Sequence, residues 1–177
     1  MSDLVKNIIR FSLFVFIQVY VFDVMPHLHE LITPYLYFLY LLWLPFSIKR
    51  GWLLLLGFLL GMTVDYFTMT PGLHAAACVL VAFLRPLIIH LLSPKDAAGY
   101  TYQEPSPRAM GWSAYSLYAL ILSFAHNFYL LFLEWLSFGA FINFMMKVLS
   151  TTAISMLLIF ITELLFFRKQ RYRTNTA

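Results

Sequence analysis

Residues 57–67 read GFLLGMTVDYF, a stretch in which one carboxylate, Asp65, interrupts a segment apolar enough to cross a membrane. Positions four apart lie nearly one above another on an α-helix, so Gly57, Gly61 and Asp65 are expected to form one ridge. Glycines let a second helix approach closely, and a carboxylate at bilayer depth is costly unless it meets a polar partner or water. The ridge is therefore predicted to face protein, as a helix-packing surface within the chain or as a partner interface.

Composition places the chain among membrane proteins. Hydrophobic residues make up 62% of 177 positions and charged residues 11%, against about half and about a quarter in soluble domains. Because a spanning helix needs about 20 residues, this length leaves little room for a separate soluble domain. The net charge of +4 accompanies no basic stretch that would read a nucleic acid, so no nucleic-acid partner is expected.

Hydrophobic runs bounded by polar or turn residues divide the chain into six predicted spans within a single domain, residues 1–177. They cover residues 8–25, 31–48, 52–68, 74–92, 112–135 and 144–167. The predicted fold class is therefore an all-α integral membrane protein, a six-helix transmembrane bundle. Short connections, such as the one around Pro71-Gly72, make neighbouring helices antiparallel.

The basic residues support this division. Eleven of the twelve lie at the N-terminus, in the second and fourth connections or near them, and at the C-terminus, which an even number of spans places on one side. The positive-inside rule predicts that this side, with both termini, is cytoplasmic. Residues 93–111 are predicted to form a flexible cytoplasmic loop, and residues 168–177 a basic cytoplasmic tail.

Several polar residues fall inside the predicted spans. Asp65 lies about 20 Å from the cytoplasmic end of its span, and His126 with Asn127 lies at about the same level in the fifth, so these buried polar groups are able to meet. Arg85 and Glu163 both lie near the cytoplasmic face, so Arg85 is expected either to form an ion pair with Glu163 or to extend its side chain to that face. For Asp65, three roles stay open: a buried acid bonded to hydroxyls or His126, a contact with a partner subunit, or proton and substrate chemistry.

The sequence offers no set of residues for catalysis or for a cofactor. The residue types of Asp65 and His126 would suit an acid/base pair, but no nucleophile, metal-ligand set or phosphate-binding glycine loop accompanies them. We therefore expect no enzymatic activity, no cofactor and no metal.

One part of the chain resembles a known family, the rod shape-determining protein MreD family. The resemblance covers about residues 44–92. It is carried by Leu44-Pro45, Arg50-Gly51, the GFLLGMTVD run at 57–65 and the Pro71-Gly72-Leu73-His74-Ala75 turn. Elsewhere the chain agrees with the family in size, span number and basic termini.

The resemblance implies a non-enzymatic scaffold of the bacterial cell-elongation complex in the inner (cytoplasmic) membrane, supporting cell shape and lateral peptidoglycan synthesis. The implied primary partner is MreC, alongside MreB, RodA and its class B penicillin-binding transpeptidase; a homo-oligomer stays open. The family is also similar in architecture to the substrate-binding membrane subunits of energy-coupling-factor transporters. The alternative function is therefore a vitamin-type small-molecule binding subunit of such a transporter, which predicts converging polar groups near the outer side.

Overall fold

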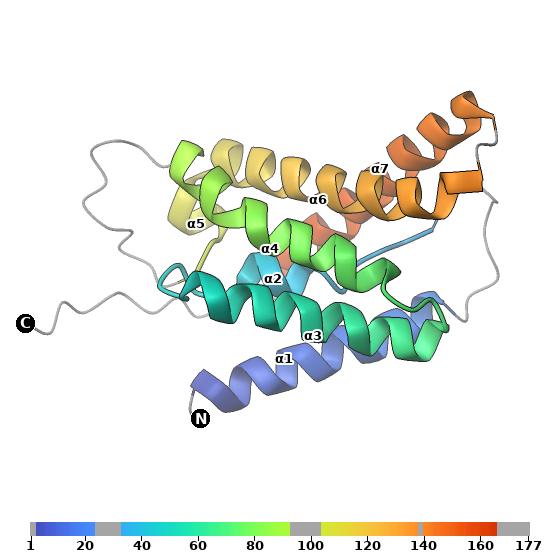
Figure 1. Cartoon of the computed structure of the whole chain (residues 1–177). Helices are drawn as coiled ribbons and strands as arrows, with labels where there is room; N and C mark the ends of the chain where they lie inside the picture. Colours follow the sequence, from blue (N-terminus) through green and yellow to red (C-terminus); the bar gives the residue numbers. More distant parts are fainter. Residues whose placement is uncertain (1–2, 24–32, 93–103, 138–139, 166–177) are drawn as a thin grey trace, which may run out of the picture.

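The computed structural model describes residues 3–23, 33–92, 104–137 and 140–165, which form an elongated bundle of helices (Figure 1). Among them, five helices are long and apolar enough to cross a membrane. These are α1 (Asp3–Ile17) with its π-helical continuation η1 (Gln18–Phe22), α3 (Arg50–Thr68), α4 (Leu73–Leu92), α6 (Trp112–Glu134) and α7 (Phe141–Leu165). The chain is a multi-pass, all-α membrane protein, as its composition predicted.

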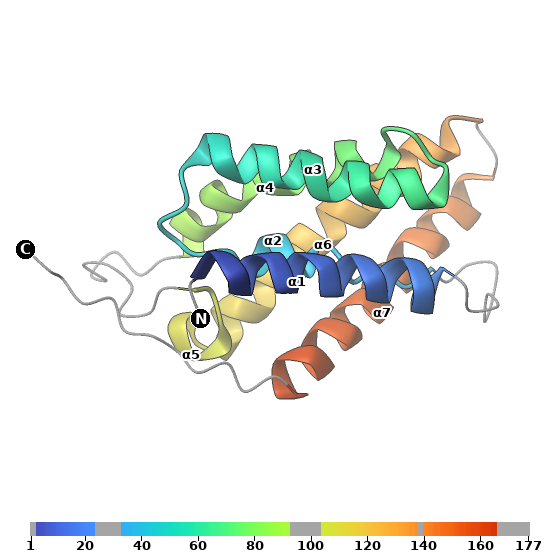
Figure 2. The same ribbon diagram turned by 90° about the horizontal axis from the view of Figure 1, so that it is seen from below.

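The long helices pack in a simple order. α3 and α4 form an antiparallel hairpin, α6 packs against α4, and α7 packs against α6, while α1 lies along α3 (Figures 1 and 2). The α3–α4 turn contains two left-handed residues, Met69 at φ 57° and Gly72 at φ 87°. Glycine suits this conformation because it has no Cβ, so the predicted Pro71-Gly72 turn lies where the chain reverses.

The two ends of the bundle carry different features. The α3–α4 and α6–α7 connections lie at one end, named here the hairpin end (Figure 1). α1 and α3 begin, and α4 ends, at the opposite end, named here the terminal end. Lys6 and Arg50 belong to the first turns of α1 and α3, so these two basic residues share the terminal end.

The second predicted span departs from the expected six-helix bundle. Of residues 31–48, the described part is 33–48, and only α2 (Leu39–Trp43) within it is α-helical. This central segment, residues 33–48, runs between the long helices, and every residue from Tyr35 to Leu44 is buried. The prediction of a sixth spanning helix over these residues was therefore wrong.

Two features explain the broken segment. Pro34 and Pro45 stand near its two ends, and proline lacks the backbone N–H that would continue a helix. A non-helical backbone is tolerated at membrane depth where protein surrounds it, as it does here. The apolar and aromatic composition predicted a helix because a spanning helix and a segment buried on every side select the same residue types.

The predicted flexible loop, residues 93–111, lies partly outside the described residues. Its last part contains a short helix, α5 (Pro107–Met110), whose N-cap Ser106 accepts a hydrogen bond from the backbone N–H of Ala109 at 3.1 Å. Glu104, just before it, forms a 2.8 Å ion pair with Arg10 of α1. Part of this loop is therefore a helix tied to α1, and the basic tail at 168–177 lies outside the described residues.

Candidate functional site

The polar residues of the interior gather around the central segment. At the half nearer the hairpin end, the carboxamide of Gln18, in η1, binds the segment through its backbone. Gln18 Oε1 accepts from the N–H of Leu36 at 3.0 Å, and Nε2 donates to the carbonyl of Pro34 at 3.1 Å and to Asp23 Oδ1 at 3.0 Å. A fully buried side chain thus supplies the backbone bonds that a helix would have made itself.

At the other half of the segment, Arg85 of α4 has the same role. Its side chain is 1% exposed. Nη2 donates to the carbonyl oxygen of Leu44, and Nε donates to the hydroxyl of Tyr118 at 3.1 Å. The Tyr118 hydroxyl in turn donates to the carbonyl of Leu42 at 3.1 Å. The guanidinium therefore holds two carbonyls where α2 ends, one directly and one through Tyr118.

The predicted ion pair between Arg85 and Glu163 is not among the contacts of the described residues. Glu163, in α7, accepts hydrogen bonds from Trp43 Nε1 at 2.6 Å and from the hydroxyl of Tyr115. The expectation failed because it considered depth alone, whereas the broken segment lies between the two helices and offers carbonyls to Arg85 and an indole to Glu163. Both charged groups fasten the segment.

The middle of the segment carries a buried chain of hydrogen bonds. The hydroxyl of Tyr37 lies 2.7 Å from Nδ1 of His74 and 2.8 Å from Nε2 of His126. The opposite ring nitrogen of His126, Nδ1, lies 3.0 Å from Oδ1 of Asn127. The His126 ring also stacks on Phe38 with centroids 4.3 Å apart. Tyr37 therefore joins α4 to α6 across the central segment.

The chain ends on α7. Asn127 Nδ2 donates to the hydroxyl oxygens of Thr152 at 3.3 Å and Ser155 at 3.4 Å. The predicted neighbours His126 and Asn127 thus belong to one network that spans three helices and the segment. Asp65 binds elsewhere, so the anticipated meeting of Asp65 with His126 is not found.

Asp65 closes the α3–α4 hairpin and is 2% exposed. Oδ1 accepts from the backbone N–H of His74 at 2.9 Å and from the Thr70 hydroxyl at 3.2 Å. Oδ2 accepts from the N–H groups of Ala75 at 2.9 Å and Gly72 at 3.1 Å. These N–H groups begin α4 and have no partner in their own helix, so a carboxylate from α3 caps α4 and meets the positive end of its dipole.

The glycines of the ridge face the same helix. A Cβ on Gly57 would lie 3.0 Å from the carbonyl oxygen of Cys78 and 3.1 Å from Cβ of Ala82. A Cβ on Gly61 would lie 2.6 Å from the carbonyl oxygen of His74 and closer still to the backbone of Ala75. Gly57, Gly61 and Asp65 therefore pack α3 on α4 within the chain, and α4 covers the surface that a partner would have used.

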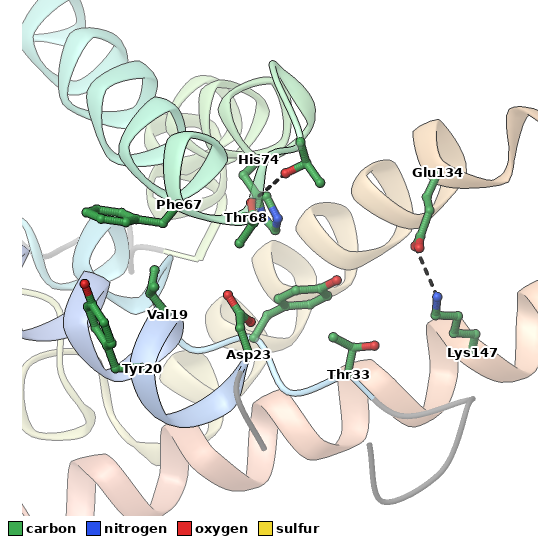
Figure 3. A pocket seen from close by; sticks show the side chains of 11 residues that line it. Val19, Tyr20, Asp23, Thr33, Phe67, Thr68, His74, Glu134 and Lys147 are labelled. Carbon is green, nitrogen blue, oxygen red and sulfur yellow. Dashed lines mark hydrogen bonds and ion pairs between the residues drawn. The ribbon is translucent and has the colours of Figure 1, made fainter. Parts of the chain in front are cut away.

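A cavity of about 740 Å³ opens at the hairpin end (Figure 3). Its polar lining comes from almost every element there: Asp23 after η1, Thr33 and Tyr35 of the central segment, His74 of α4, Glu134 of α6 and Lys147 of α7. Lys147 donates to Glu134 Oε2 at 3.1 Å across one wall. His74 lines the cavity and also contacts the Tyr37 hydroxyl, so its ring belongs both to the cavity lining and to the buried chain of hydrogen bonds.

The sequence did not predict the broken form of the central segment or the role of Tyr37. Arg85 and Glu163 were predicted as buried polar residues, but their contacts with the segment were not. Pro34 and Pro45, near the two ends of the segment, were the available signal for a break. Within the described residues, no group of three or more His, Cys, Asp and Glu side chains is placed to hold a metal ion.

Comparisons of the chain with protein-family models, curated proteins and solved structures give no match, so the function is argued from these residues and their geometry.

Proposed function

We propose that this protein is a non-enzymatic scaffold of the MreD type in the bacterial inner membrane. In this role it binds the single membrane span of MreC and links it to MreB, RodA and the class B penicillin-binding transpeptidase during cell elongation. The terminal end would face the cytoplasm, as the basic residues indicate. The support comes from the resemblance over residues 44–92 and from one surface of the bundle.

The residues that carry the resemblance include the α3–α4 hairpin, which is closely packed. Gly57 and Gly61 bring α3 against α4, and Asp65 caps α4 by accepting three backbone hydrogen bonds, with a fourth from the Thr70 hydroxyl. Gly57, Gly61 and Asp65 already contact α4 of the same chain, so a membrane span of a partner must bind to a different surface. The α3–α4 hairpin presents one on its other side.

That surface is an apolar groove of about 560 Å³ along α4, and this groove is the observation on which the proposal rests. Its lining includes the small residues Gly72, Ala75 and Ala76 and the large residues Phe58 of α3 and Phe83 of α4. Both phenylalanines are about half exposed, at 47% and 50%. The groove therefore combines small residues with large apolar side chains that are open to the bilayer.

This shape suits a membrane-spanning helix. Apolar burial gives helices little advantage over lipid, so association in a bilayer depends on close packing at small residues. Small residues let the backbone of a partner helix come close, and the exposed phenylalanines extend the apolar contact. A single-span partner such as MreC offers one helix of this kind.

Co-purification from native membranes tests the proposal. Ala76→Trp places a large side chain in the lining of the groove, and Leu149→Trp adds the same side chain to α7, where Leu149 is 62% exposed. We expect MreC to co-purify with the wild type and with Leu149→Trp, and to be lost at least tenfold from Ala76→Trp. Unchanged thermal unfolding of both variants verifies folding. Equal recovery of MreC with both variants, or its absence from the wild-type preparation, would contradict the proposal.

A further inference from the structure

The cavity at the hairpin end is separate from the α4 groove and has a different chemistry. Its charged lining among the described residues consists of two carboxylates, Asp23 and Glu134, and one ammonium, Lys147. With neutral histidine, these groups sum to one negative charge. Tyr20 and Phe67 lie at the side between α1 and α3, with ring centroids 6.2 Å apart. The cavity thus combines an acidic balance with aromatic rings, which favours a cation.

The buried chain of hydrogen bonds fixes what His74 presents to this cavity. Asn127 directs its amide nitrogen to two hydroxyl oxygens on α7, so its carbonyl oxygen faces Nδ1 of His126. An oxygen acceptor requires a hydrogen on that nitrogen. A neutral imidazole then has a lone pair on Nε2, and the neutral form suits a ring that is fully buried among apolar helices.

The phenol of Tyr37 has a single hydrogen to donate. Tyr37 must donate its hydroxyl hydrogen to Nε2 of His126, which leaves the Tyr37 oxygen as an acceptor towards His74. Nδ1 of His74 therefore carries the hydrogen in that bond. Nε2 of the same ring has a lone pair, and it has no hydrogen-bond partner among the described residues.

His74 lines the inner wall of the cavity, so this lone pair is a hydrogen-bond acceptor offered to an occupant. The chain from Asn127 through Tyr37 holds the ring in one tautomer and one orientation. A ligand that suits the site must donate hydrogen bonds and carry positive charge. A primary ammonium group meets both conditions, whereas a quaternary ammonium has charge without N–H donors.

We propose that the hairpin-end cavity binds a primary ammonium group, which donates to His74 Nε2 and is balanced by the carboxylates of Asp23 and Glu134. The group can belong to a free amine or to the headgroup of phosphatidylethanolamine. Tyr20 is 56% exposed and Phe67 45% exposed at the edge of the cavity, so a lipid headgroup has a route from the bilayer. This binding goes beyond the scaffold role and does not depend on it.

Ethanolamine and choline compounds distinguish the two properties of the ligand. The full chain is placed in nanodiscs of phosphatidylcholine, and thermal unfolding is followed while ethanolamine or choline is added. A second arm replaces the lipid with phosphatidylethanolamine. We expect stabilisation by ethanolamine if the source is a free amine, or by phosphatidylethanolamine if it is a lipid, and at least tenfold weaker binding of the choline form. Equal effects of both head groups, or no effect in either arm, would overturn the proposal.

Two variants locate the effect. Asn in place of His74 keeps a nitrogen near the position of Nδ1 but has none at Nε2, so His74→Asn should weaken binding at least tenfold while largely preserving the contact with Tyr37. Asp23→Asn should weaken binding through the loss of charge. The control is Glu104→Gln, which neutralises an acid at the terminal end. Binding unchanged in both cavity variants would also overturn the proposal, and MreC co-purification from His74→Asn reports on the scaffold separately.

Discussion

Gly61 of α3 and Ala75 of α4 stand in direct backbone contact, so that a single added methyl group on Gly61 has no space. A Cβ on Gly61 would come closest to the Cα of Ala75 and would lie 2.5 Å from the backbone nitrogen of Ala75. The atoms in the way belong to the backbone, so no side chain can turn aside. The contact fixes the distance between the two helices at the level where Asp65 caps α4.

Gly61→Ala is therefore expected to lower the free energy of unfolding by about 1–3 kcal/mol, the usual cost of overpacking. The measurement is thermal or denaturant unfolding of the purified chain in detergent. Gly51→Ala is the matched control, because a Cβ on Gly51, in the first turn of α3, has nothing within 4 Å. Helix propensity predicts that this control is neutral or slightly stabilising. Equal loss in both variants would show that the close contact does not limit the packing.

Asp65→Asn tests the cap on α4. The amide nitrogen of asparagine would face backbone N–H groups, two donors against each other, and the charge opposite the helix dipole would be lost. We expect the free energy of unfolding to fall by about 3 kcal/mol, measured by thermal or denaturant unfolding. Thr63→Val, two residues earlier on α3, removes a hydroxyl that donates to the carbonyl of Leu59 in its own helix, and it should change stability by less than about 1 kcal/mol. A mild effect of Asp65→Asn would argue against the cap.

The sequence was sufficient for features that depend on local pattern and insufficient for those that depend on distant partners. Four predicted spans coincide with α3, α4, α6 and α7 within a few residues, because hydropathy and turn residues are local signals. The ridge at Gly57 and Gly61 followed from spacing alone. The central segment was missed because the groups that replace its helical bonds, Gln18 and Arg85, lie far from it in sequence. Depth likewise placed Asp65 inside the bundle, and of its predicted partners a hydroxyl, that of Thr70, is found, whereas His126 is not. For Glu163, depth suggested Arg85, whereas the partners found are Trp43 and Tyr115.

Gln18→Leu removes the side chain that binds the central segment and keeps a similar volume. The N–H of Leu36 would then be buried without a partner, and the carbonyl of the half-buried Pro34 would lose its hydrogen bond. We expect the free energy of unfolding to fall by about 1–3 kcal/mol for each group left unsatisfied. Hydrogen exchange at the Leu36 amide should become faster. Ser150→Ala, on α7, serves as the control, since its hydroxyl bonds carbonyls of its own helix. Unchanged exchange at Leu36 would mean that Gln18 does not hold the segment.

Tyr37→Phe removes one oxygen that bridges two histidines. His74 and His126 would each lose a hydrogen bond inside the bundle, so we expect the free energy of unfolding to fall by about 1–3 kcal/mol. Without the bridge, the His74 ring is free to change tautomer, so ethanolamine binding should also weaken. Tyr66→Phe is the control at a residue that is 75% exposed. Wild-type stability and ethanolamine binding in Tyr37→Phe would remove the basis for a fixed His74 tautomer.

Arg85→Lys keeps the charge and tests the geometry of the guanidinium. Arginine binds Leu44 and Tyr118 through two different nitrogens, whereas the single nitrogen of lysine cannot occupy both positions. A buried charge with fewer partners is costly, so we expect a loss of about 2–4 kcal/mol in unfolding measurements. Arg50→Lys is the matched control, because Arg50 lies over the exposed ring of Phe83 at 4.5 Å, and a lysine there changes stability by less than about 1 kcal/mol. If both variants unfold alike, the end of the central segment is held by packing and not by Arg85.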